Sequence, residues 1–331
     1  MGIGVGQGIA IVVEKMAWPA ERGEEVDQHK EKPMANGTRN LADEDLTRAV
    51  LASFEDSTSE RFRQVVQSLV RHLHAFVKEV GLTEEEWFRG IDFLTRTGHI
   101  TDDKRQEFIL LSDVLGVSMQ VIQINNQKPA EATASTVFGP FFVEGSPRFV
   151  NGDDIANGAP GEPCFMQGRV LSITGEPIAD AHIEVWQADD KGFYDVQYQE
   201  LAQARGRGHL YADEEGRYYF WSVRPEAYPI PEDGPVGELL EAANRSPMRP
   251  AHVHFLIKAP GYQTLITHVF KQGDRYLDSD AVFGVKSSLI TGFERHEPGT
   301  APDGKQMDVP FYTMSYDFLL APDEEKDGHS S

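Results

Sequence analysis

The residues best suited to chemistry lie in the stretch Arg249-Pro250-Ala251-His252-Val253-His254, a His-x-His pair with an arginine upstream. The apolar run that follows it, Phe255-Leu256-Ile257, predicts a β-strand. Side chains two residues apart on a strand project from the same face, so His252 and His254 could present both imidazoles to one metal ion. Strand histidines are more often hydrogen-bonded polar residues without a metal. The pair alone does not decide between these interpretations.

A second pair with the same spacing, His72-Leu73-His74, lies in a segment of helical periodicity. Residues two apart on a helix diverge by about 200° around its axis. His72 and His74 therefore cannot share an ion, and we expect them to be structural or exposed.

Two tyrosines stand in loops of the same half of the chain as His252. Tyr194 follows Gly192-Phe193, and Tyr228 opens the rigid sequence Tyr228-Pro229-Ile230-Pro231. A free phenol has a pKa of about 10, yet a trivalent metal ion can hold it as phenolate at neutral pH. Two phenolates with two neutral imidazoles would form a hard, anionic site that suits Fe(III) better than zinc. Each tyrosine taken singly is more often a packed aromatic with a hydrogen-bonded hydroxyl, so spacing alone leaves the question open.

Residues 43–127 show the periodicity of helices. Between residues 62 and 80, apolar side chains recur at i, i+3, i+4 and i+7. Ser57 with Glu60 predicts a capping box before this helix, and Gly81 predicts its end. A further helix is expected over residues 102–115. The apolar faces would serve as core, as a dimer contact or as a groove for a lipid chain, with core the simplest interpretation.

Short β-rich runs separated by Gly, Pro and Asp turns follow residue 127, and Gly216 in residues 213–216 predicts a hairpin turn. Many closely spaced strands without helices between them indicate an antiparallel sandwich or barrel. The fold class is thus α+β, with 1–42 an irregular leader, 43–127 a helical domain, 128–322 a β-sandwich domain and 323–331 an acidic tail. Met34 is an alternative start of the protein.

Composition excludes several classes of partner and site. The chain has 331 residues, with 31 basic and 53 acidic side chains and a net charge of −22. This acidity argues against nucleic acid or an anionic membrane as the main partner. The single cysteine, Cys164, allows neither an intrachain disulfide nor a cysteine zinc cluster and fits the cytoplasm. The apolar run at residues 9–13 is too short to span a bilayer.

Four ordered motifs resemble the intradiol ring-cleaving dioxygenases, over roughly residues 43–320. They are Thr136-Val137-Phe138-Gly139-Pro140-Phe141-Phe142, Ile183-Glu184-Val185-Trp186-Gln187-Ala188 leading to Gly192-Phe193-Tyr194, Tyr228-Pro229-Ile230-Pro231, and Arg249-Pro250-Ala251-His252-Val253-His254. Within the family, the resemblance is closest to the hydroxyquinol-cleaving branch, on residues 71–76, 106–113 and 276–286.

The resemblance implies a site residue by residue. Fe(III) would be held by Tyr194, Tyr228, His252 and His254, with Arg249 over the substrate ring. His268 stands where the catechol-cleaving branch carries Gln near the metal, and it would lie next to the metal ligands. The positions that match the substrate pocket are Leu110, Asp113, Val137, Phe138, Gly139, Pro140, Phe141, Ile230, Pro231 and Val282.

The implied reaction is ring opening of hydroxyquinol by O2 to 3-hydroxymuconate, the enol form of maleylacetate. Tyr228 would take a proton from the substrate, and the always cationic Arg249 would stabilise developing negative charge. Asp113 would accept a hydrogen bond from the third hydroxyl. The alternatives are a catechol or chlorocatechol 1,2-dioxygenase, a non-catalytic β-sandwich binding module, and a zinc hydrolase. The last is disfavoured because no third nitrogen or carboxylate ligand is linked by motif to His252 and His254.

The resemblance also implies partners. The helical domain would dimerise, and a phospholipid would occupy an apolar tunnel at the helical interface. No nucleic acid and no transmembrane segment are expected.

Overall fold

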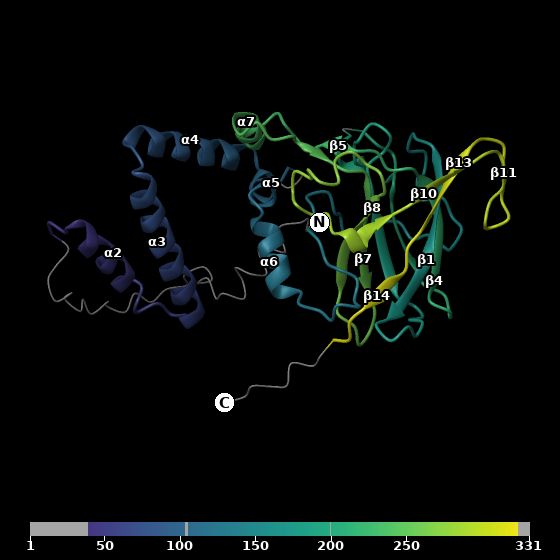
Figure 1. The fold of residues 1–331 in the computed structure, drawn as a ribbon, viewed down its shortest axis with the longest axis horizontal. Coiled ribbons are helices and arrows are strands. Elements are labelled where there is room, and N and C mark those ends of the chain that lie inside the picture. The colour runs from purple at the N-terminus through teal and green to yellow at the C-terminus, as the bar shows by residue number, and fades with distance from the viewer. Residues whose placement is uncertain (1–38, 103–104, 199, 324–331) are drawn as a thin grey trace. The chain divides into compact units, whose positions relative to one another are not determined.

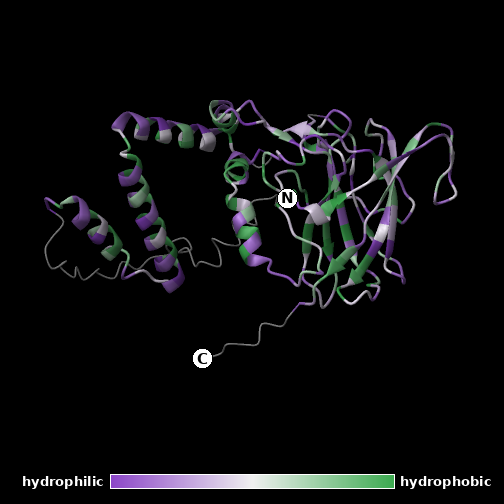
Figure 2. Cartoon of the chain, viewed as in Figure 1, coloured by the Kyte–Doolittle hydropathy of each residue, from purple (hydrophilic) through white to green (hydrophobic). Residues whose placement is uncertain are grey.

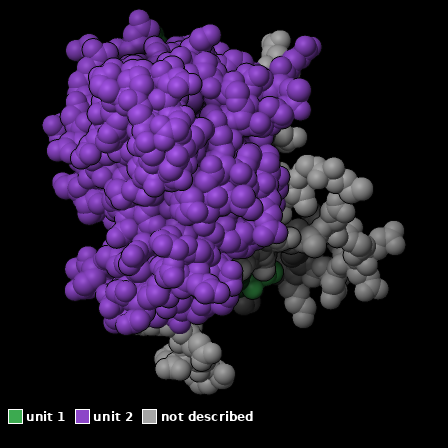
Figure 3. Space-filling view, turned by 90° about the vertical axis from the view of Figure 1, so that its right-hand side faces the viewer, with its two compact units in different colours: residues 1–95 green, residues 96–331 purple. Residues whose placement is uncertain are grey.

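The computed structural model describes residues 39–102, 105–198 and 200–323, and the predictions for the leader up to residue 38, for Met34 and for the tail from residue 324 lie outside them. The chain forms two compact units, Met1–Thr95 and Arg96–Ser331 (Figure 3). The division falls within helix α4 (Glu84–Ile100). This division lies before the predicted domain boundary at residue 127, which marks the change from helices to strands.

The first unit contains α2 (Asp43–Ala52), α3 (Glu60–Val80) and the start of α4. The N-cap of α3 is Ser59, whose Oγ accepts a hydrogen bond from the Phe62 amide at 3.2 Å. The predicted capping by Ser57 is wrong, because the Ser57 hydroxyl donates instead to the carbonyl of Phe54 at 2.6 Å. Gly81 ends α3 as predicted, in the left-handed conformation with φ +61°.

The helix expected over residues 102–115 is two shorter helices, α5 (Glu107–Val114) and α6 (Val117–Asn125). Gly116 between them has φ +73°, a conformation that ends one helix and allows the chain to turn before the next. Both helices belong to the second unit. No single helix in the described part of the chain is long and apolar enough to cross a membrane, and α5 with α6 meets that criterion only as a pair bent by 78°.

Two five-stranded sheets build the second unit (Figure 1). One sheet has the order β3 (Arg207–Tyr211), β2 (His182–Trp186), β7 (His252–Lys258), β8 (Leu265–Lys271), β9 (Ile290–Thr291). The other has the order β10 (Phe293–His296), β13 (Phe311–Ser315), β1 (Pro163–Ser172), β14 (Phe318–Leu320), with β4 (Arg217–Val223) also paired to β1. The remaining elements are η1 (Asp195–Gln197), β5 (Tyr228–Pro229), α7 (Pro235–Ala242), β6 (Met248–Arg249), η2 (Ser287–Leu289), β11 (Gly299–Thr300) and β12 (Gln306–Met307).

The α+β class is confirmed, and the pairing is mostly antiparallel. Three pairs are parallel, however: β1 with β13, β1 with β14, and β8 with β9. The turn at residues 213–216 is present, with Gly216 at φ +72°. It joins β3 to β4, which lie in different sheets, so the predicted hairpin is a crossing between the sheets.

The core lies between the two sheets. Alternate side chains of each strand enter it, including Val185 on β2, Phe255 on β7 and Phe220 on β4, and all three are fully buried. Figure 2 shows hydrophobic and hydrophilic residues interleaved along the strands of this unit, as expected when one face of a strand enters the core. Because the side chains of a strand alternate between faces, the residues between these core positions project from the outer face of the first sheet, where the histidines of β7 lie.

Candidate metal centre

The His-x-His pair lies on β7, as predicted. Val253 and Phe255 belong to the core between the sheets, so His252 and His254 share the opposite face. Both histidines are buried, and their Nε2 atoms are 3.1 Å apart. His252 Nδ1 donates to the carbonyl of Pro250 at 2.7 Å, which leaves the Nε2 lone pair free for a ligand or a metal.

Tyr194 reaches the same place from the loop after β2. Its neighbour Asp195 is held by Arg207 at 2.7 Å, and Phe141 stacks on its ring with centroids 4.5 Å apart. Gly192 has φ +82°, and a Cβ at this position would lie 2.5 Å from the Cβ of Tyr228. Only glycine therefore lets this loop approach the second tyrosine so closely.

Tyr228 lies on β5, where its register partner is Arg249 on β6. This short two-stranded sheet brings the arginine and the phenol to the histidines of β7. The Tyr228 hydroxyl is 3.0 Å from the Tyr194 hydroxyl and 3.4 Å from His252 Nε2. Arg249 Nη1 lies 3.2 Å from His252 Nε2.

The four predicted ligand atoms converge on one point. The Tyr194 oxygen is 2.8 Å from His254 Nε2 and 3.5 Å from His252 Nε2. Ligands about 2.0 Å from a single ion stand about 2.8 Å apart at 90° and about 3.5 Å apart at 120°. The observed separations have this range, so the donor set fits a metal ion bound by all four residues.

Protonation in the absence of a cation also fits a metal site. Burial raises the pKa of Tyr194 well above 10, and burial raises the pKa of Tyr228 despite the charge of Arg249. Burial and then Arg249 lower the pKa of His252 to about 3, and burial lowers that of His254 well below 6.5. The imidazoles are thus neutral, as metal ligands must be, and a cation is needed to hold the phenols as phenolates.

Asp280 orients Arg249, a role that the sequence analysis did not assign. Its carboxylate accepts from Arg249 Nε at 3.0 Å and Nη2 at 3.4 Å, and from the Gly284 amide at 2.9 Å. Burial alone would lower the pKa of Arg249, but the charge of Asp280 raises it above its usual value. Asp280 lies inside the segment 276–286 that carried part of the resemblance, but an acid 31 residues from its partner gives no signal of pairing.

His268 is brought to the same cluster by strand register. It lies opposite His254 on β8, and its Nδ1 is 3.3 Å from Arg249 Nη2. Its nitrogen lies within 4.8 Å of those of His252 and His254. The structure thus places a third nitrogen near this pair, which the sequence could not link to it. The phenol oxygens of Tyr194 and Tyr228 lie nearer to the imidazole nitrogens, at 2.8–3.5 Å.

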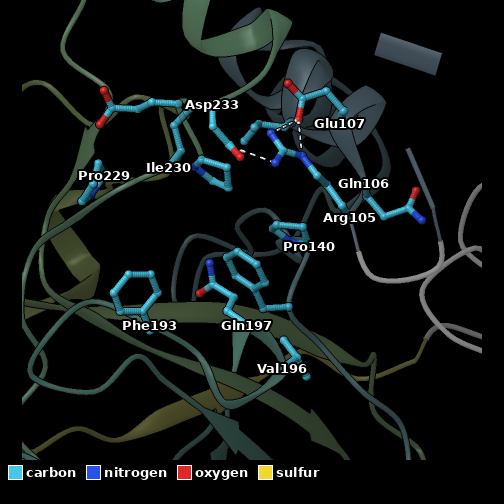
Figure 4. Close-up of a pocket in the computed structure, with 14 residues that line it drawn as sticks. Arg105, Gln106, Glu107, Pro140, Phe193, Val196, Gln197, Pro229, Ile230 and Asp233 are labelled. Carbon is cyan, nitrogen blue, oxygen red and sulfur yellow. Dashed lines mark hydrogen bonds and ion pairs between the residues drawn. The ribbon is translucent and has the colours of Figure 1, made fainter. Parts of the chain in front are cut away.

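A cavity of about 560 Å³ is lined by Phe193 and Pro229, the sequence neighbours of Tyr194 and Tyr228, but not by the tyrosines themselves. Of the predicted substrate residues, it is lined by Leu110, Pro140, Phe141, Ile230 and Pro231. Figure 4 shows Arg105 directed at Glu107 and Asp233, across the cavity from Phe193. The distances of these ion pairs are 3.0 Å and 2.8 Å. None of these four residues was predicted to line a pocket, although Phe193 and Glu107 lie within segments that carry the family resemblance.

The other predicted pocket residues lie outside this lining. Gly139 passes His254 so closely that a Cβ there would be 3.1 Å from His254 Cε1. Phe138 packs edge-on against Trp186 at 5.8 Å and lines a different cavity. Val137 and Val282 are buried, with 1% and 2% of their surface exposed.

Asp113 is buried on α5, one turn after Leu110, with 3% of its surface exposed. Burial raises the pKa of its carboxyl to about 6, against the opposing effects of a hydrogen bond from Ser118 and the charge of Arg249. A group one helical turn from a lining residue shares its face. Asp113 thus lies on the same face of α5 as Leu110, although it is not among the residues that line this cavity.

Known proteins resemble most of this chain. A family model described as "Dioxygenase" matches residues 137–322, and one described as "Catechol dioxygenase N terminus" matches residues 59–133. The hydroxyquinol 1,2-dioxygenase of Nocardioides simplex is 55% identical over 281 residues, 85% of this chain and 96% of that protein. The 6-chlorohydroxyquinol 1,2-dioxygenase of Cupriavidus pinatubonensis is 56% identical over 277 residues, 84% and 96% of the two chains.

Solved structures agree with these relatives. The hydroxyquinol 1,2-dioxygenase of Pseudomonas putida DLL-E4 matches with a TM-score of 0.79 and 48% identity, covering 85% of this chain and 99% of that chain. The catechol 1,2-dioxygenase of Pseudomonas arvilla C-1 matches with a TM-score of 0.74 and 28% identity, covering 86% and 93%.

Proposed function

The chain belongs to the intradiol ring-cleavage dioxygenases, and we propose that it opens the ring of hydroxyquinol with O2 at a non-haem Fe(III) centre. The observation that carries this proposal is the convergence of two phenol oxygens and two imidazole nitrogens, with separations of 2.8–3.5 Å for five of their six pairs. The relatives named as hydroxyquinol dioxygenases, at 50–55% identity, support the substrate. The product would be 3-hydroxymuconate, the enol form of maleylacetate.

The ligands of the iron would be Tyr194, Tyr228, His252 and His254. Phenolate oxygen is a hard, anionic donor, and two such donors favour Fe(III) over softer divalent ions. When bound, Fe(III) would withdraw electron density from an aromatic diol and make it reactive toward O2. The zinc hydrolase and the non-catalytic binding module are not supported, because the chain belongs to a family of dioxygenases.

Tyr228 is the proposed base. Its hydroxyl lies between Tyr194 and His252, and burial favours its neutral form. A Tyr228 phenolate would therefore take a proton from a substrate hydroxyl readily and become the phenol that its surroundings favour. Arg249 stays cationic beside it, held by Asp280. The guanidinium is thus preorganised to stabilise negative charge that develops on the ring.

The proposed pocket is the cavity lined by Leu110, Pro140, Phe141, Ile230 and Pro231. Val137, Phe138, Gly139 and Val282 are proposed as surrounding positions, and His268 as a neighbour that accepts from Arg249. Asp113 would accept a hydrogen bond from the third hydroxyl of hydroxyquinol. A charged hydrogen bond contributes about 1.5–3 kcal/mol. We therefore expect Asp113→Ala to reduce the preference for hydroxyquinol over catechol by about 10- to 100-fold.

A second candidate substrate is a chlorinated hydroxyquinol, because a relative that is 56% identical is named as a 6-chlorohydroxyquinol 1,2-dioxygenase. Catechol and chlorocatechols are weaker candidates, since a relative named catechol 1,2-dioxygenase is 37% identical and solved chlorocatechol dioxygenases are 26–28% identical. Oxygen uptake should be measured with hydroxyquinol, 6-chlorohydroxyquinol, catechol and 3-chlorocatechol. We predict the highest kcat/KM for one of the two hydroxyquinols, and a higher value for catechol would refute the proposed substrate.

We also propose that the N-terminal helices mediate a homodimer and that a phospholipid binds at the helical interface, in a protein of the cytoplasm. The dimer is supported by apolar side chains of α3 that are exposed in the isolated chain. Leu69, Leu73, Phe76 and Val80 have 50–55% of their surface exposed. Sedimentation of the purified protein, with lipid extraction and mass analysis, tests both proposals.

A further inference from the structure

A second group of potential metal ligands lies on the same sheet as the iron site. It consists of His182 and Glu184 on β2 and His209 on β3, with ligand atoms that all lie within 4.8 Å of one another. His182 Nε2 is 3.6 Å from Glu184 Oε1. Two imidazoles and one carboxylate form a ligand set that Zn²⁺ and other divalent transition ions bind.

Strand geometry places these three side chains on one face. Ile183 and Val185 enter the core between the sheets, so His182 and Glu184 project from the opposite face. His209 is the register partner of Glu184 across the β2–β3 pair. Trp186, the next residue on this face, stacks on His254 with centroids 4.7 Å apart. The indole thus separates the three residues from the proposed iron ligands.

Ser146 prepares two of the three side chains for a metal. The Ser146 carbonyl is 2.9 Å from His209 Nδ1, so it accepts the Nδ1 proton and leaves the Nε2 lone pair for a cation. The Ser146 hydroxyl donates to Glu184 Oε2 at 2.5 Å. This fixes the carboxylate with its other oxygen toward His182. Outer hydrogen bonds of this kind orient metal ligands in proteins.

The charge balance of Glu184 also points to a cation. The residue has 8% of its surface exposed, and in the described part of the chain the hydrogen bond and ion pair of its carboxylate are with the hydroxyl of Ser146 and the imidazole of His182. Glu184 lines a cavity together with Lys258. Burying a carboxylate without a compensating positive charge is unfavourable. Lys258, the register partner of His182 on β7, is exposed. Its ammonium group can therefore remain in solvent.

We propose that His182, Glu184 and His209 form a second metal site, for a divalent transition ion of the Zn²⁺ class with solvent as the remaining ligand. Zn²⁺ bound at about 2.0–2.1 Å places its ligand atoms about 3.3 Å apart. The separation of 3.6 Å between His182 and Glu184 is already close to this value. The ion ties β2 to β3 and, through Ser146, to the segment that precedes β1. This proposal does not depend on the assignment of substrate.

The test uses tag-free, iron-loaded enzyme dialysed against micromolar Zn²⁺, followed by analysis of both metals. We expect one Zn²⁺ per chain with the iron retained. His182→Gln and Glu184→Gln should each weaken Zn²⁺ binding at least tenfold, whereas His72→Gln, at an exposed histidine of α3, should bind normally. If Glu184→Gln does not fold, His182→Gln, at a half-buried residue, is compared with the wild type instead. The iron absorption band verifies that the variants are folded.

Three results would overturn the proposal. They are the absence of bound Zn²⁺, equal binding by wild type and both variants, and binding of Zn²⁺ only as iron is lost. Anomalous diffraction at the zinc edge locates the ion independently. A peak between the side chains of β2 and β3 is expected. Zinc peaks found only at other positions would contradict the assignment.

Discussion

Replacing Asp113 with asparagine should stabilise the protein at neutral pH and have much less effect in acid. The pKa of Asp113 is raised from 3.8 to about 6 by burial. A raised folded-state pKa means that the favourable contribution of the protonated acid is fully present below pH 3.8 and is lost as the pH rises through 6. The shift of about 2 pKa units corresponds to about 3 kcal/mol above pH 7, since one unit is about 1.4 kcal/mol.

Urea unfolding of wild type and Asp113→Asn between pH 4.5 and 7.5 measures this difference. The stability advantage of the variant should grow by about 2 kcal/mol across that range, most of it below about pH 6.5. Asp278→Asn, at an exposed aspartate, is the matched control and should change stability by less than about 0.5 kcal/mol. A difference that does not vary with pH, or a wild type more stable than the variant at pH 7, would refute the reasoning.

Two further predictions concern the support of the iron ligands and of Arg249. Asp280→Asn should lower kcat/KM by about 100-fold, because it weakens the ion pair that orients Arg249. The iron absorption band should stay in place, because Asp280 is not a proposed iron ligand. An unchanged kcat/KM would show that Asp280 does not orient Arg249 for catalysis. Gly192→Ala should destabilise the fold by about 1–3 kcal/mol and loosen iron, because its Cβ would lie 2.5 Å from that of Tyr228. Gly81→Ala, where φ is also positive but nothing lies within 4 Å, should cost only about 1 kcal/mol and leave iron binding unchanged.

The shared face of the histidine pair could be predicted from the sequence because it follows from a local rule. His252 and His254 need only one strand to share a face, and the strand is evident from the apolar run after them. Tyr194 and Tyr228 stand out only through the motifs that surround them. Their convergence on the histidines, with separations of 2.8–3.5 Å, depends on tertiary structure that no spacing reveals.

The error at Ser57 is local, whereas the missed contact of Asp280 and the missed parallel pairing depend on residues far apart in the chain. Ser57 matches the capping pattern better than Ser59, yet the preceding turn engages its hydroxyl with Phe54. Asp280 reaches Arg249 from 31 residues away. The parallel pairing of β1 with β13 and β14 joins segments nearly 150 residues apart, and alternation of side chains does not distinguish it from antiparallel pairing.

The visible absorption spectrum of the iron-reconstituted enzyme tests the proposed site most directly. Charge transfer from tyrosine phenolate to Fe(III) should make the wild type red-brown. Tyr228→Phe and His254→Ala should each shift or bleach this band, because each removes one of the four donors that converge in the structure. Protein that binds iron without colour, or variants with the spectrum of the wild type, would contradict the assignment of Tyr194, Tyr228, His252 and His254 as the ligands.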